Sequence, residues 1–142
     1  MKFEGFQHIN IRCSVDDLPA IERFYSEVLG LRVGFRPSFT FPGAWLYDGD
    51  HPIVHVAARY PQGSFVKDRH NSSVDHIAWK TSGAVAFRKH LESLGLTFDE
   101  QNVEDAGYQV FLYDPVGTKL EFNFADEYVA DAVPVGTELT LR

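Results

Sequence analysis

Four side chains of this 142-residue chain are candidate ligands for a divalent metal ion, namely His8, His55, His76 and Glu121. Neutral imidazole nitrogen atoms and a carboxylate oxygen atom suit iron, manganese, cobalt, nickel or zinc. His8 and His76 stand inside two similar apolar phrases, "FQHINIRC" and "VDHIAWKT". A buried imidazole without a partner costs on the order of a few kcal/mol. The occurrence of a histidine at two equivalent positions therefore indicates a shared function.

An internal repeat relates the four positions in pairs. The phrase "HINI" at His8 returns as "HIAW" at His76, "LGL" at position 29 returns at 94, and "LYD" at position 46 returns at 112. The offsets are 68, 65 and 66 residues. Nine residues after the start of each "LYD" stand His55 and Glu121, which makes these two equivalent in the halves. The repeat predicts a divalent-metal site at the four positions His8, His55, His76 and Glu121.

Each half has the pattern of one β-strand, one α-helix and three further β-strands. Alternating apolar residues indicate the strands, and apolar residues at helical spacing indicate the helices. In the first half we expect a helix that begins after Asp16 or Asp17 and ends at Gly30. In the second half we expect Ser82 to cap the helix and Gly95 to end it. The expected strands cover residues 6–13, 31–36, 43–47 and 53–58, then 74–81, 97–100, 108–113 and 119–124.

The predicted fold class is therefore α+β, with two tandem βαβββ modules in a single domain. Module one covers residues 1–58 and module two covers residues 74–124. The polar segment 59–73 contains Pro and Gly and is expected to be a linker. Residues 125–142 have only a weak pattern, so we expect a C-terminal tail that packs as an arm.

Strand alternation predicts which side chains share a face with the candidate ligands, because successive residues point to opposite sides. The apolar residues meet the helices, which leaves the candidate ligands on the other face. Asn10 and Arg12 share that face in module one, and Lys80, Lys119 and Asn123 share it in module two. The three cations, on a chain of net charge −7, favour a small anionic substrate. The alternative is that they are simply solvated at the strand ends.

The segment 35–49, "FRPSFTFPGAWLYDG", combines prolines, glycines and aromatic residues. This composition suits a mobile apolar wall over a binding pocket, with Trp45 as a substrate contact. Packing in the core explains Trp45 and Tyr47 equally well.

Composition disfavours several other classes of protein. The chain is 44% hydrophobic and 14% aromatic, as is typical of one globular domain. Its acidic balance, with a pI of about 5.2, disfavours nucleic acid as a partner. Cys13 is the only cysteine, which excludes an internal disulfide and a thiolate metal cluster. The apolar runs are short and the N-terminus has no signal pattern, so we expect no membrane association and a cytoplasmic setting.

The paired modules, with His8 opening the first, His76 opening the second and Glu121 near the end of the second, resemble the vicinal oxygen chelate superfamily. "FYSEVLGLRV" and "YDPVGTKLEF" carry the same resemblance, which covers about residues 4–125. The superfamily includes glyoxalase I, extradiol ring-cleaving dioxygenases, methylmalonyl-CoA epimerase, fosfomycin-resistance transferases and metal-free bleomycin-binding proteins. The resemblance implies a curved-sheet cup around one divalent metal ion, a Lewis acid toward two adjacent oxygen atoms of a small substrate. It also implies a homodimer, with each site inside one chain or shared between subunits.

Two subfamilies resemble the chain in different ways. Glyoxalase I matches His8, His76 and Glu121 but carries a second Glu where this chain has His55. Extradiol dioxygenases match the same three residues as a two-histidine, one-carboxylate set, and they hold a nearby acid/base histidine, a role that His55 could fill. They place a tyrosine ten residues before the last ligand, where this chain has Phe111, with Tyr113 two residues further on.

The resemblance leaves three functions open. The first is an extradiol-dioxygenase-like oxidoreductase with Fe(II) or Mn(II), and the second is a glyoxalase I-like or epimerase-like lyase or isomerase with Ni, Co or Zn. The third is a drug-binding resistance protein. The expected catalytic residues are His55 and Glu121. The expected substrate-binding residues are Asn10, Arg12, Lys80, Lys119, Asn123, Trp45, Phe111 and Tyr113.

Overall fold

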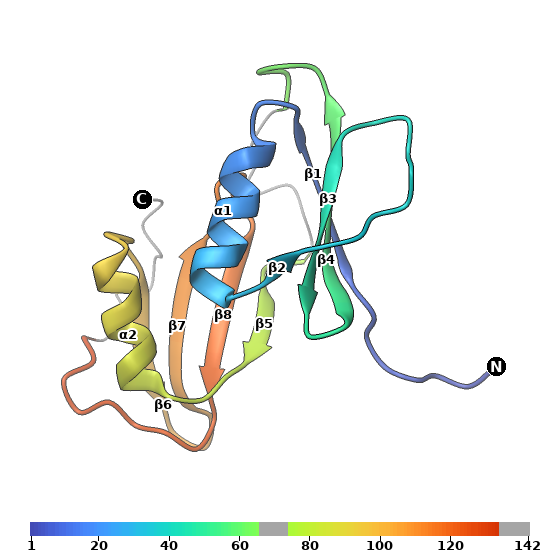
Figure 1. The fold of residues 1–142 in the computed structure, drawn as a ribbon. Coiled ribbons are helices and arrows are strands. Elements are labelled where there is room, and N and C mark those ends of the chain that lie inside the picture. The colour runs from blue at the N-terminus through green and yellow to red at the C-terminus, as the bar shows by residue number, and fades with distance from the viewer. Residues whose placement is uncertain (66–73, 134–142) are drawn as a thin grey trace. The chain divides into compact units, whose positions relative to one another are not determined.

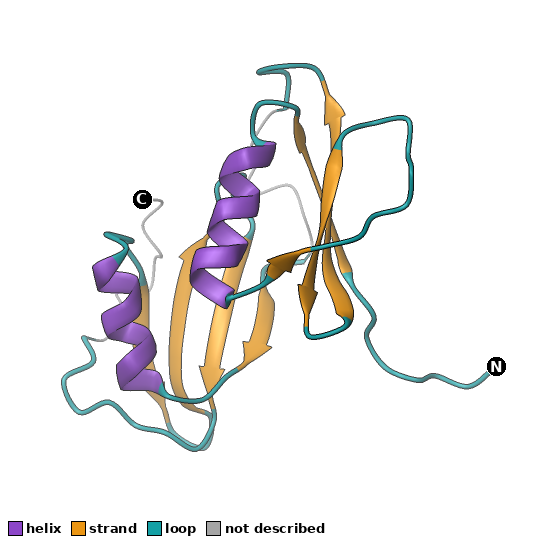
Figure 2. Cartoon of the chain, in the orientation of Figure 1, coloured by secondary structure: helices purple, strands orange, loops and turns teal. Residues whose placement is uncertain are grey.

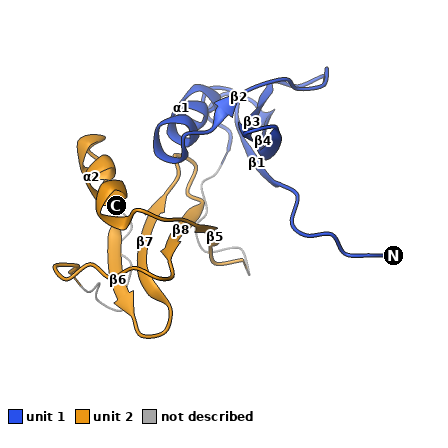
Figure 3. Cartoon of the chain, turned by 60° about the horizontal axis from the view of Figure 1, so that its bottom comes forward, with its two compact units in different colours: residues 1–67 blue, residues 68–142 orange. Residues whose placement is uncertain are grey.

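The computed structural model of the chain describes residues 1–65 and 74–133. The chain divides into two compact units, residues 1–67 and residues 68–142 (Figure 3). Each unit contains one helix and one four-stranded mixed sheet (Figure 2). The predicted α+β class and its two βαβββ modules are therefore confirmed.

Unit 1 is built in the order strand, helix, three strands (Figure 1). The sheet order is β1-β4-β3-β2, with β1 parallel to β4 and the other pairs antiparallel. The elements are β1 (Ile9–Ser14), α1 (Leu18–Leu29), β2 (Arg32–Val33), β3 (Gly43–Asp48) and β4 (His51–Tyr60).

Helix α1 begins and ends close to the predicted residues. Asp17 is at the N-cap, but its carboxylate makes no bond to the helix and accepts the Ser14 backbone N–H at 3.2 Å instead. Gly30 ends the helix at φ 72°, a left-handed conformation that glycine adopts without strain. The buried residues of α1 are the ones that helical spacing predicts, Ile21, Phe24, Tyr25 and Val28.

Unit 2 repeats this topology. The sheet order is β5-β8-β7-β6, again with the first strand parallel to the last and the other pairs antiparallel. The elements are β5 (Ile77–Lys80), α2 (Ala84–Ser93), β6 (Asp99–Val103), β7 (Gly107–Tyr113) and β8 (Lys119–Phe124). The side chain of Phe87 in α2 packs on Phe122 of β8, with ring centroids 4.6 Å apart.

The predicted cap of α2 by Ser82 is wrong. Gly83 is the N-cap residue, at φ 84°, and no side chain of the preceding turn caps the helix. The carboxylate of Glu127 accepts the backbone N–H groups of Gly83 and Ala84 at 2.6 and 2.8 Å. An acidic side chain also suits this position because the N-terminus of a helix carries partial positive charge. The helix start is therefore stabilised by a residue more than forty positions later in the chain.

Glu127 belongs to a segment, residues 125–133, that we call the C-terminal strap. Asn102 of β6 exchanges two hydrogen bonds with the backbone of Val129, at 2.8 and 3.1 Å. Arg88 of α2 binds Asp131 at 2.8 Å and also lies 3.1 Å from the buried carboxylate of Glu100. The described part of the predicted tail thus packs on unit 2, while residues 134–142 lie outside the described part of the chain.

Some strand lengths differ from the prediction. Strand β2 covers only two residues of the expected 31–36, and the chain then continues into the loop 34–42. Strand β4 extends through Arg59 and Tyr60, which were expected to be linker. His8 and His76 each stand one residue before their strand rather than inside it.

The strand register supports the repeat at the level of single residues. Asn10 pairs with His55 between β1 and β4, and Ala78 pairs with Glu121 between β5 and β8. Trp45 lies opposite His55 on the next strand, just as Phe111 lies opposite Glu121. His55 and Glu121 therefore occupy equivalent positions in the two sheets.

Burial follows the predicted faces. Ile11 and Cys13 of β1 are buried while Asn10 and Arg12 are exposed. On β8, Leu120, Phe122 and Phe124 are buried on the helix side. No helix in the described part of the chain is long and apolar enough to cross a membrane.

Candidate metal centre

In unit 1, the two predicted ligands lie directly against each other. The imidazole rings of His8 and His55 are stacked, with centroids 3.9 Å apart and an interplanar angle of 16°. The indole ring of Trp45 stacks on His55 at 4.0 Å and 7°. His55 is thus held between a histidine and a tryptophan, which fixes its ring plane.

The chemistry of His55 is that of a neutral imidazole with one unused nitrogen atom. Its Nε2 atom is buried and has no hydrogen-bond partner among the described residues. Burial lowers the pKa of His55 below its ordinary value, and the neighbouring His8 lowers it further, against an opposing hydrogen bond at the Pro52 backbone. Buried polar atoms normally find a partner, so an unpaired Nε2 on a neutral ring fits a metal ligand or a proton acceptor.

In unit 2, the other two predicted ligands are in direct contact. The His76 Nε2 atom lies 2.9 Å from Oε2 of Glu121. Glu121 is only 7% exposed, although it lies on the face of β8 that the helix does not cover. An imidazole nitrogen and a carboxylate oxygen that converge at this distance suit two donors to one divalent ion.

A third residue of unit 2, Asp75, supports this pair and was not predicted. Its Oδ2 atom lies 2.8 Å from His76 Nδ1, so the carboxylate holds the ring with Nε2 toward Glu121. Metal-binding histidines commonly donate their second N–H to a carboxylate in this way. In unit 1 the equivalent residue, Gln7, contacts His8 Nδ1 through its side-chain oxygen. The repeat offset of 68 relates Gln7 to Asp75, and this was the signal that could have identified both.

The local charge differs from the expected ring of three cations. Lys119 Nζ lies 2.9 Å from Asp75 Oδ2, so its charge is balanced. The hydrogen bond from His76, followed by the contact with Lys119, lowers the pKa of the Asp75 carboxyl. Arg12 and Lys80 are exposed. The free positive charge on these faces is therefore smaller than the sequence alone suggested.

The remaining predicted substrate contacts lie beside the ligand pairs. Asn123 donates to Glu121 Oε1 at 3.2 Å, so it orients that carboxylate. Phe111 meets His76 edge to face at 6.2 Å, and Tyr113 pairs across the strands with Lys119. Asn10 lies opposite His55 in the ladder. Trp45 is used in the stack on His55 rather than in the core on the helix side.

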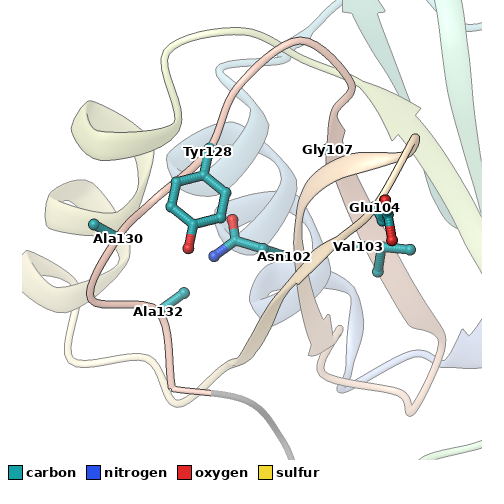
Figure 4. Close-up of a pocket in the computed structure, with 7 residues that line it drawn as sticks. All are labelled: Asn102, Val103, Glu104, Gly107, Tyr128, Ala130 and Ala132. Atoms are coloured by element: carbon teal, nitrogen blue, oxygen red, sulfur yellow. The ribbon is translucent and has the colours of Figure 1, made fainter.

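A pocket of about 520 Å³ in unit 2 is separate from these residues (Figure 4). It lies between the strap and the β6–β7 hairpin, and none of the predicted site residues lines it. Its lining residues are Asn102, Val103, Glu104, Gly107, Tyr128, Ala130 and Ala132.

The donor types of the two pairs, nitrogen and oxygen, suit Fe, Mn, Co, Ni or Zn. In the described part of the chain, no group of three or more His, Cys, Asp or Glu side chains is arranged to hold a metal ion. In each unit, one pair of the predicted ligands is in contact, His8 with His55 and His76 with Glu121.

Comparison with known proteins identifies the family. Residues 5–122 match the family described as the Glyoxalase/Bleomycin resistance protein/Dioxygenase superfamily. The chain belongs to this superfamily. A relative from Arabidopsis thaliana, named Glyoxylase I 4, is 33% identical over 122 residues, which cover 82% of this chain and 68% of the relative. The expected resemblance to the vicinal oxygen chelate superfamily is thus confirmed.

Solved structures of the glyoxalase superfamily share the fold. A glyoxylase/bleomycin resistance protein/dioxygenase domain from Frankia sp. EAN1pec is 16% identical, with a TM-score of 0.73 over 87% of this chain and 99% of that one. The fosfomycin resistance protein FosX from Listeria monocytogenes, complexed with Mn(II) and 1S,2S-dihydroxypropylphosphonic acid, is 14% identical. Its TM-score is 0.67 over 87% of this chain and 94% of that one.

Proposed function

We propose that this chain is a divalent-metal-dependent enzyme of the glyoxalase I type, a lyase or isomerase acting on a small substrate with two adjacent oxygen atoms. His8, His76 and Glu121 are the proposed ligands, with His55 as either a fourth ligand or the acid/base. The contact between His76 Nε2 and Glu121 Oε2 at 2.9 Å, backed by Asp75, is the observation that carries the proposal. The relative named Glyoxylase I 4 supports the reaction class.

The chain's own residues have distinct tasks in this proposal. A divalent ion, when bound, would polarise the two substrate oxygen atoms as a Lewis acid. Asp75 and Asn123 hold His76 and Glu121 in place. His55, neutral at pH 7 because its pKa is lowered, has a free Nε2 atom that can take a substrate proton and return it.

An extradiol-dioxygenase-like oxidoreductase is the second candidate, and His55 is the observation that favours it. Glyoxalase I carries a carboxylate at this position, whereas ring-cleaving dioxygenases use a nearby acid/base histidine. The stacked ring of His55, with one unpaired nitrogen, suits that role. We rank the lyase first because of the relative named Glyoxylase I 4. From the sequence alone, the dioxygenase was expected to be the more probable of the two.

Elemental analysis of protein purified without added metal, combined with two assays, separates the candidates. Nickel, cobalt or zinc, with turnover of a thiohemiacetal in the absence of oxygen, supports the lyase. Iron or manganese, with oxygen consumption on a catechol-like diol, supports the dioxygenase instead. Protein that contains no metal, binds none on addition and sequesters a drug in its place would overturn both.

The ligand assignment has its own variant. Glu121→Ala should lose most of the bound metal, because Glu121 is the only carboxylate among the four candidates and supplies charge that neutral imidazoles cannot. Glu104→Ala, which removes an exposed acid from the β6–β7 turn of the same unit, is the matched control and should keep it. Full metal retention in a folded Glu121→Ala protein contradicts the assignment.

A further inference from the structure

Unit 1 carries two arginine side chains beside the His55 stack that no predicted role uses. Arg36 stands in the loop 34–42 between β2 and β3, which Figure 1 shows as a wide loop, and Arg59 stands near the end of β4. Both guanidinium groups lie on the ring of Phe41, Arg36 with its Cζ atom 5.1 Å from the centroid and Arg59 with its Cζ atom 4.4 Å from it. Two like charges therefore share one aromatic ring.

Among the described residues, no acid balances either charge. Arg36 donates to the backbone oxygen of Phe41 at 3.0 Å and also lies over Phe39 at 4.6 Å. No carboxylate in the described part of the chain lies within ion-pair distance of Arg36 or Arg59. On a chain of net charge −7, two neighbouring guanidinium groups without an acidic partner are an unusual local excess of positive charge.

The strand register relates these groups to the face of the candidate metal ligands. Ala57 alternates with His55 along β4 and so lies on the same face of the sheet, while Arg59, at the register shift near the end of the strand, lies on the ring of Phe41. Gly43 pairs with Ala57 and lies two residues from Trp45, which stacks on His55. A side chain at Gly43 would approach the guanidinium of Arg36 to about 3.0 Å, so Arg36 lies over Gly43.

The sheet residues beneath Arg36, Gly43 and Ala57, are of the two smallest types. Gly43 has no side chain and Ala57 has one methyl group, so the Arg36 guanidinium can lie directly on the sheet at Gly43. A Cβ atom at Gly43 would also meet the Val56 backbone oxygen at 2.2 Å, so glycine is required there. Two residues along a strand span about 7 Å. Gly43 is therefore about 7 Å along β3 from Trp45, which pairs with His55.

We propose that Arg36 and Arg59 form an oxyanion subsite over Gly43 and Ala57, one row from His55. Its ligand is a carboxylate, phosphate or phosphonate group carried by the small substrate of the proposed enzyme, so this inference rests on the proposed function for the identity of that substrate. Guanidinium groups bind such anions through paired N–H donors. The aromatic rings of Phe39, Phe41 and Trp45 form the apolar wall beside the subsite.

Anion binding to the metal-free protein tests the subsite. Titration with inorganic phosphate at low ionic strength, followed by calorimetry, should give saturable binding to the wild type. Arg36→Gln and Arg59→Gln should each weaken it at least about tenfold, because each removes charge-assisted hydrogen bonds. The matched control is Arg23→Gln, an exposed arginine of α1, which should bind phosphate as the wild type does.

Two further variants keep the test decisive. Arg36 also donates a hydrogen bond to the Phe41 backbone, so Arg36→Gln can disturb the loop itself. Arg59→Gln removes a side chain that lies on the Phe41 ring near the end of β4. Circular dichroism checks that both variants fold. Arg59→Lys keeps the charge but loses the paired N–H donors of the guanidinium group. Its affinity for phosphate should therefore fall between those of the wild type and Arg59→Gln. A parallel titration with acetate identifies the anion, since stronger acetate binding indicates a carboxylate and stronger phosphate binding a phosphate or phosphonate.

The outcomes separate this subsite from the metal proposal. Glu121→Ala should leave phosphate binding unchanged, so loss of metal in that variant and loss of phosphate in the arginine variants are independent results. Wild-type phosphate affinity in both folded Gln variants overturns the subsite, and so does an equal loss in Arg23→Gln. Neither of these results bears on the metal ligands.

Discussion

At the scale of single residues, His8 and His76 are oriented in the same way. The residue before each histidine, Gln7 or Asp75, contacts its Nδ1 atom. This leaves Nε2 of His76 directed at Glu121. The residue that contacts Nδ1 differs in charge between the units, because it is an amide in unit 1 and a carboxylate in unit 2. The Nδ1 atom of His76 is therefore held by a charged acceptor, and that of His8 by a neutral one.

Replacing Asp75 should weaken metal binding without removing a ligand. We expect Asp75→Asn to reduce metal affinity by about 10-fold to 100-fold, the usual effect of losing a carboxylate that orients a ligating histidine. Competition with a chromophoric chelator measures the change. Asp50→Asn, in an exposed turn of unit 1, is the control and should bind metal normally. An unchanged affinity in Asp75→Asn would show that His76 does not need this partner.

The role of His55 can be decided by separating metal content from turnover. If His55 is the acid/base, His55→Ala should keep its metal while turnover falls by about a hundredfold or more, as is typical for a lost proton-transfer group. If His55 is a ligand, the same variant should lose metal. Elemental analysis and the activity assay on one preparation distinguish the two. A variant that keeps both its metal and its turnover would exclude both roles.

At the scale of elements, the start of α2 depends on the C-terminal strap. The helix has glycine at its N-cap and no acidic residue in its first turn. Glu127 supplies the missing acceptor for Gly83 and Ala84. The same strap is tied to β6 through Asn102 and to α2 through Arg88 and Asp131. Strap and helix should therefore lose their order together.

Removing the Glu127 carboxylate tests this dependence. We expect Glu127→Ala to lower the free energy of unfolding by about 1 kcal/mol, the usual cost of a lost helix N-cap. Urea denaturation measures the change. Asp126→Ala removes the neighbouring exposed acid, for which no interaction with the described residues is found, and should leave the stability within about 0.5 kcal/mol of wild type. Equal stability of both variants would contradict the capping role.

At the scale of the whole molecule, the two ligand pairs belong to two compact units. The superfamily resemblance implies a homodimer, in which a site is completed either by both units of one chain or by units of different chains. The predicted ligands are the same in both cases. The two arrangements differ in what happens when defective chains are mixed.

Mixing two inactive variants distinguishes them. His8→Ala and Glu121→Ala each remove one proposed ligand, from different units. If the site is shared between subunits of a symmetric dimer, joint unfolding and refolding gives mixed dimers with one intact site, and about a quarter of the wild-type metal content returns. If each site lies within one chain, nothing returns. Elemental analysis reads the outcome, and each variant refolded alone is the control.

Local patterns determined much of the fold and half of the candidate site. Alternation with a period of two residues assigned Glu121 to the face away from the helix, and the repeat made His55 its equivalent, in agreement with the register. The ends of α1 followed from Asp17 and Gly30. These features depend on residues close in the chain, so the sequence by itself specifies them.

Tertiary structure decided what depends on contacts between distant residues. The stack of Trp45 and His55, the neutralisation of Lys119 by Asp75 and the cap of α2 by Glu127 join residues 10, 44 and more than 40 positions apart. Each requires a particular strand register or chain path, and composition and periodicity do not contain that information. The sequence therefore determined which residue types face the candidate site, whereas only the packed chain decided which charge is balanced and which arginines lack an acidic partner among the described residues.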